Sequence, residues 1–146
     1  MKRLLSIAIV CLLLLSCASA DSVSSLCEQW NSLGKYYSSV ELTEDIAVQK
    51  DGRITFTGDG WKLFFWEDDS NLGVYAEDFQ TLMCNSAAAG LMVADDASGF
   101  TEYLGGIAYQ FITLISGETP LMLGYSGYLY NVAQIDKGYM MLLKKY

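Results

Sequence analysis

Carboxylates are the side chains of this sequence with the most obvious potential for chemistry, because the chain contains no histidine. It therefore lacks the usual general base at neutral pH and every Ser-His or Cys-His nucleophile pair. Paired carboxylates can hydrolyse glycosidic bonds, but here they gather in short turn-like groups, at Glu67-Asp68-Asp69, Glu77-Asp78 and Asp95-Asp96. The pattern predicts solvated turns, no catalytic residue, and a protein that is not an enzyme. A hydrolase is the distant alternative.

The same residue types give little support for a bound ion or cofactor. None of the acidic groups has the alternating spacing of a calcium loop, and Asp95 to Gly99, the nearest approach, lacks the distal glutamate. Gly58-Asp59-Gly60 lacks the glycine spacing and the basic residue of a phosphate loop. The sequence predicts no metal site and no cofactor.

The first twenty residues have the pattern of an export signal. Lys2 and Arg3 precede an apolar run from Leu4 to Leu15, which is too short to span a bilayer. Leu14-Leu15-Ser16-Cys17 resembles the lipobox of bacterial lipoproteins, and the resemblance implies that Cys17 becomes an acylated lipid anchor. Ala18-Ser19-Ala20 equally suits an ordinary signal peptidase, which would leave a secreted or periplasmic protein. Residues 1–20 are predicted to be the signal, and residues 21–146 a single globular domain.

Two cysteines follow the signal, Cys27 and Cys84. A lone pair in an oxidising compartment usually forms a disulfide, which is the prediction here, and free buried thiols are the alternative. Zinc binding is not expected, because two distant cysteines without histidine do not complete a tetrahedral site.

Charge and aromatic content limit the partners. Without Lys2 and Arg3, seven of the nine basic residues remain against 17 acidic ones, a net charge of −10. Nucleic acid is therefore excluded, and the membrane is expected to be reached through the lipid anchor only. Ten tyrosines stand out, and Tyr125, Tyr128 and Tyr130 are the candidate ligand-binding residues. Core packing is the competing explanation for these aromatic side chains.

Hydrophobic periodicity and turn residues predict the elements that must position these side chains. Apolar residues at steps of three and four predict a helix from Ser22 to Tyr36, and a similar pattern predicts another from Glu77 to Ala89. A hairpin of residues 46–49 and 53–57 turns at Asp51-Gly52, and strands follow at 61–66 and 72–75. The C-terminal part is predicted as strands at 103–116, 121–132 and 139–143. The apolar residues within 103–116 fit the period of a helix as well as that of a strand. The β-branched and aromatic content of the segment favours a strand.

These elements predict an α+β fold in which an N-terminal helix packs on a curved antiparallel β-sheet, with a second helix before the last strands. Gln29-Trp30, the segment Asp51 to Thr57 and the segment Tyr130 to Asp136 resemble the small lipocalin-like lipoproteins. That resemblance implies the alternative fold, an all-β lipocalin-like barrel, in families of which some members bind small apolar ligands.

The expected function is that of an exported, lipid-anchored cell-envelope protein that binds a small apolar ligand or an envelope protein. The alternative is a structural or stress-protective lipoprotein without a dedicated ligand.

Overall fold

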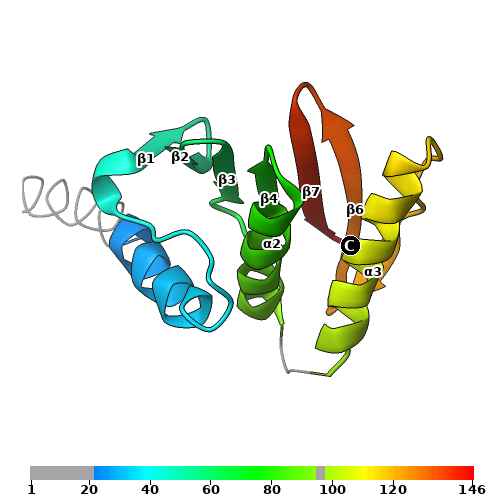
Figure 1. Ribbon diagram of the computed structural model, residues 1–146. Coiled ribbons are helices and arrows are strands. Elements are labelled where there is room, and N and C mark those ends of the chain that lie inside the picture. The colour runs from blue at the N-terminus through cyan, green and yellow to red at the C-terminus, as the bar shows by residue number, and fades with distance from the viewer. Residues whose placement is uncertain (1–21, 95–97) are drawn as a thin grey trace, which may run out of the picture.

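A seven-stranded antiparallel sheet covered on one face by three helices makes up residues 22–94 and 98–146, the part of the chain that the computed structural model describes. The N-terminal helix spans residues 22–34, α2 spans Phe79–Val93 and α3 spans Phe100–Ile115. Figure 1 shows the three helices side by side, with α2 in the middle. The α+β prediction is confirmed.

The sheet is open. Its strands are β1 (Ala47–Lys50), β2 (Arg53–Gly58), β3 (Trp61–Trp66), β4 (Asn71–Ala76), β5 (Leu123–Tyr125), β6 (Tyr128–Ile135) and β7 (Gly138–Lys145). Their order in the sheet is β1-β2-β3-β4-β7-β6-β5. Because β1 and β5 lie at opposite edges, the sheet does not close, and the alternative of a barrel is wrong. The last strand, β7, pairs with β4 in the interior of the sheet.

The N-terminal helix is held by Trp30, which is fully buried. Its ring meets Phe65 of β3 edge-on at a centroid distance of 5.8 Å, and its indole N–H donates to the Val40 carbonyl at 2.8 Å. Asn31 follows on the same helix and exchanges two hydrogen bonds with the backbone of Leu42. The predicted stripe of apolar residues thus forms the helix and attaches it to the sheet. A short 3-10 helix, η1 (Glu44–Ile46), then leads into β1.

The first four strands form the predicted meander. Asp51 and Gly52, with φ of +54° and +71°, turn β1 into β2, as the Asp-Gly pair predicts. On the inner side of these strands, Phe56, Leu63 and Val74 are fully buried against the helices. Alternation along each strand therefore divides the sheet into a covered inner face and an outward face.

Helix α2 confirms the second predicted helix and extends it to Val93. Its buried residues include a run of small ones, Ala87 to Gly90, which allow close approach to neighbouring elements. A β-carbon added to Gly90 would clash with the Tyr103 ring of α3. The two helices therefore fit together through a glycine and an aromatic ring.

Residues 100–115 correct the predicted strand at 103–116, because they form helix α3. The apolar residues of this segment fit the spacing of a helix as well as that of a strand. Tertiary packing selects the helix. Ile107 is fully buried, and so is Gln110. The Gln110 side chain accepts from Val132 N of β6 at 2.7 Å and donates to the carbonyl of Leu121, which precedes β5, at 2.8 Å. Gln110 thereby satisfies a backbone N–H of β6 beyond the last residue that pairs with the short β5.

The predicted single strand from Leu121 to Val132 is also corrected. Ser126 and Gly127 have φ of +48° and +79°, so the chain turns there and forms the β5–β6 hairpin. Gly127 therefore marks a reversal of the chain and not a position within one long strand. As a result Tyr125 lies directly opposite Tyr128 on the same face of the sheet.

Candidate functional site

The three candidate tyrosines lie inside the protein. Tyr125, Tyr128 and Tyr130 are 6%, 8% and 2% exposed. In a continuous strand Tyr125 would face away from Tyr128 and Tyr130, but the hairpin turn places Tyr125 opposite Tyr128. All three side chains consequently share the inner face, which the helices cover.

Tyr103 of α3 organises this tyrosine cluster. Its ring stacks on Tyr125 at 4.4 Å and meets Tyr130 edge-on at 4.9 Å, and its hydroxyl donates to the Ser86 carbonyl at 2.8 Å. Burial raises the pKa of Tyr103 well above its usual value, and the neighbouring Tyr130 and Tyr125 add to the rise. The cluster fastens α3 to the sheet, so its main contribution is structural.

The structure differs from the predicted disulfide, because Cys27 and Cys84 are free cysteines. Cys27 is buried on the N-terminal helix, where desolvation and the nearby Glu44 carboxylate raise the pKa of its thiol. Cys84 is half-buried on α2 and lines a shallow hollow beside Val40. Cys27 therefore lies in the core, and Cys84 lies near the surface. Cys17, the predicted anchor, lies outside the described residues.

A larger hollow, of about 730 Å³, lies between the N-terminal helix, the C-terminal end of α2 and the inner face of the sheet. Its floor is apolar and comes from the sheet: Ile54, Phe65 and Leu72 are each less than a tenth exposed. Leu26 and Met92 form helical walls. The position follows from the alternation of the strands, which directs these side chains toward the helices.

Tyr128 is the one candidate tyrosine that reaches this hollow. Its hydroxyl donates to the Asp69 carbonyl at 3.2 Å, and the backbone N–H of Lys145 donates to the Ser70 carbonyl at 2.8 Å. The turn between β3 and β4 is therefore tied to both β6 and β7. One side of the hollow is held in place by these bonds.

The rim of the hollow is polar. It includes Gln29, Gln49, Glu67, Asp69 and Lys145, all exposed. Gln49 donates a side-chain hydrogen bond to the Glu67 carboxylate, and Glu67 N donates to the Gly52 carbonyl at 2.9 Å. An apolar floor with a few oriented polar groups at the rim is the usual composition of a small-molecule site.

Within residues 22–94 and 98–146, histidine, cysteine and carboxylate side chains form no cluster able to hold a metal ion. The same part of the chain includes no helix long and apolar enough to cross a membrane.

Sequence reasoning missed the residues that wall the hollow. Leu26 belongs to the predicted apolar stripe, but Met92 lies beyond the predicted end of its helix. These two residues are far apart in the sequence, and only the packing of both helices on one sheet places them around the same space. Alternation within the strands was the one available signal, since it places Ile54 on the same side of its strand as Phe56, and Phe65 on the same side as Leu63.

Comparisons with family models, with curated proteins and with solved structures found no match to this chain.

Proposed function

We propose that this protein is an exported, lipid-anchored module of the cell envelope that binds a small apolar ligand in the hollow beneath its N-terminal helix. One observation carries the proposal: a hollow of about 730 Å³ with a floor of Ile54, Phe65 and Leu72 and a polar rim. Small-molecule sites usually measure roughly 300–1,000 Å³ and combine these two features.

The expected anchor agrees with the position of the hollow. Ser22, which lines the hollow, follows Cys17 by only five residues. Five residues of extended chain span at most about 18 Å. Acylation of Cys17 would therefore keep the hollow close to the bilayer surface, where apolar compounds accumulate.

Ligand binding is tested by filling the hollow. Leu26→Trp places a larger side chain on its helical wall, so we expect the affinity for the uncharged probe N-phenyl-1-naphthylamine to fall at least tenfold. Leu121→Trp is the matched control, because Leu121 is 77% exposed and lies away from the hollow. Fluorescence titration of the folded variants measures the change.

Equal affinity of the wild type and Leu26→Trp for the probe would contradict the proposal, as would a wild type that does not bind it. Native mass spectrometry of the protein purified from its own envelope provides a second measurement. We expect an apolar adduct that the wild type retains and Leu26→Trp loses.

Anchoring is tested separately. Cys17→Ser should move the protein from the detergent phase to the aqueous phase in a phase-separation assay, because the acylated thiol is lost. Cys11→Ser, in the same signal segment, is the control and should leave partitioning unchanged. An unmodified mature N-terminus at Asp21 would rule out the lipid anchor and leave the hollow unaffected.

A further inference from the structure

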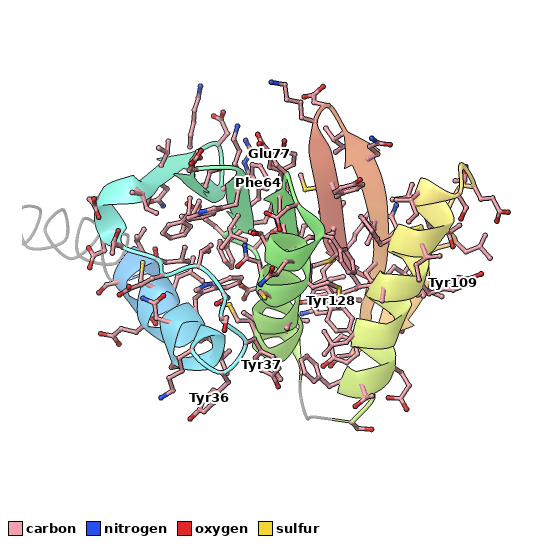
Figure 2. All side chains as sticks on the ribbon, viewed as in Figure 1. Tyr36, Tyr37, Phe64, Glu77, Tyr109 and Tyr128 are labelled. Carbon is pink, nitrogen blue, oxygen red and sulfur yellow. The ribbon has the colours of Figure 1, made fainter. Side chains whose placement is uncertain are left out.

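The outward face of the sheet is a second surface with a distinct composition. Strand alternation and register place four large apolar side chains next to one another on it, all half-buried: Phe64, Tyr75, Met140 and Leu142. The described helices contact the other face, through residues such as Trp30 and Tyr103. Figure 2 labels Phe64 beside the strands.

Two glycines of this surface leave room for neighbouring side chains to lie across the backbone. A β-carbon on Gly73 would lie 3.2 Å from the Phe64 ring and 3.7 Å from the Met140 sulfur, so both side chains lean over Gly73. At Gly138 the same construction meets the Tyr75 ring at 2.9 Å. The apolar side chains therefore form a continuous strip and not separate projections.

Cations border the strip. Lys50, Arg53, Lys62 and Lys144 are exposed and share the outward face, since each pairs across the sheet with another outward residue. Arg53 lies over the Phe64 and Trp66 rings, with its guanidinium 5.4 and 5.6 Å from their centroids. Aspartate and glutamate do not occur in any of the seven described strands.

This distribution contrasts with the charge of the whole molecule, because the strands of the sheet contribute cations to this face and no carboxylate. Four of the seven basic residues after the signal lie on this one face, although the segment from residue 21 onward carries a net charge of −10. We infer that the outward face docks an acidic amphipathic helix of a partner protein. The apolar side of such a helix would cover the strip, and its carboxylates would pair with Arg53 and Lys62.

The dimensions fit that occupant. From β2 to β6 the face crosses four strand spacings, about 19 Å, and six residues along a strand give about 20 Å. A helix of about 13 residues has this length. A second copy of this chain is disfavoured, because two outward faces would bring their cations together. The inference concerns the outward face alone and does not depend on the hollow.

The first test uses two designed helical peptides with the same leucine stripe, one flanked by glutamates and the other by lysines. We expect the acidic peptide to bind, with an affinity that falls as salt is raised, and the basic peptide not to bind. Lys62→Glu should weaken the acidic peptide at least tenfold. Lys35→Glu, which removes an exposed cation from the other side of the molecule, should not change its affinity.

The inference would be overturned by equal binding of both peptides, by no effect of Lys62→Glu in a folded variant, or by binding only to phosphatidylglycerol vesicles. Self-association of the wild type that Lys62→Glu abolishes would point to a second copy and would also overturn it.

A second test identifies the occupant in the envelope. A benzoylphenylalanine placed at the exposed, outward Thr57 should crosslink a peptide segment rich in acidic and apolar residues. The same probe at Glu118 is the control and should not capture that segment. Lipid adducts alone at Thr57 would contradict a protein partner.

Discussion

At the scale of single residues, Asp78 fixes the start of α2. It has extended backbone angles, and its carboxylate accepts hydrogen bonds from Thr81 N at 2.8 Å and the Thr81 hydroxyl at 2.7 Å. Those bonds lower the pKa of Asp78 below its usual value. The predicted helix, which begins at Glu77, includes Asp78, whereas in the structure Asp78 is the N-cap, one residue before the helix begins.

Asp78→Ala should reduce the free energy of unfolding by about 1 kcal/mol at pH 7, because a helix N-cap is lost. The folded pKa is lowered, so this stabilisation is present above the usual carboxyl pKa and disappears as the pH falls through the folded value. Urea unfolding should show a smaller difference between wild type and variant at pH 2 than at pH 7. Glu41→Gln, an exposed acid elsewhere, serves as control. A difference that does not change with pH would disprove the role of the charge.

Tyr103 gives the opposite pH dependence. Because its folded pKa is raised, its contribution is complete below about pH 10 and is lost as the pH rises further. Tyr103→Phe should reduce the free energy of unfolding by about 1 kcal/mol at pH 7, because the hydrogen bond to the Ser86 carbonyl is lost. The difference in this free energy between variant and wild type should narrow between about pH 10 and 12. Tyr109→Phe is the control, since Tyr109 is 64% exposed and projects away from α3 in Figure 2. A constant gap across this pH range would show that ionisation of Tyr103 does not limit alkaline stability.

At the scale of elements, the contact of α2 with α3 depends on Gly90. Gly90→Ala should lower the free energy of unfolding by roughly 1–3 kcal/mol, because the new methyl group meets the Tyr103 ring. Gly105→Ala on α3 is the matched control: its β-carbon would point into open space, so helix propensity should raise stability by about 0.5–1 kcal/mol. Thermal unfolding compares both variants. Equal effects of the two substitutions would mean that packing against Tyr103 does not decide the outcome.

Most elements could be predicted from the sequence because their signals are local. The stripe around Trp30 and the Asp51-Gly52 turn each act within a few residues, and both predictions are confirmed. Residues 103–116 could not be assigned in this way, since their apolar positions satisfy both periods. The choice of a helix there depends on partners distant in sequence, such as Val132 for Gln110 and Ser86 for Tyr103.

The candidate site was harder to predict than the fold. The tyrosines were the most visible aromatic signal, but one unrecognised turn at Ser126-Gly127 changed the face on which Tyr125 lies. The outward face depends on register between four or more strands, which single-strand alternation does not supply. Phe64 and Trp66 were visible as aromatic residues on one strand, whereas their association with Arg53 required the pairing of β2 with β3.

At the scale of the whole molecule, β7 is the strand that unites the sheet. It pairs with β4 on one side and β6 on the other, and it supplies the fully buried Met141 and Leu143. A chain that stops after Asp136 should therefore show no cooperative unfolding transition in urea and no near-ultraviolet circular dichroism. A chain that lacks only the exposed Tyr146 should unfold as the wild type does. A cooperative transition in the shorter chain would show that the first four strands fold with the helices alone.

The pairing of β4 with β7 also sets the order of events during biosynthesis. Leu72 pairs with Leu143, so the central ladder waits for a segment made some seventy residues later. Contacts of such long range form slowly and late. A polypeptide leaving the ribosome would expose β1 to β4 and both later helices before the strand that completes the sheet exists. This topology therefore postpones completion of the sheet until nearly the whole chain has been made.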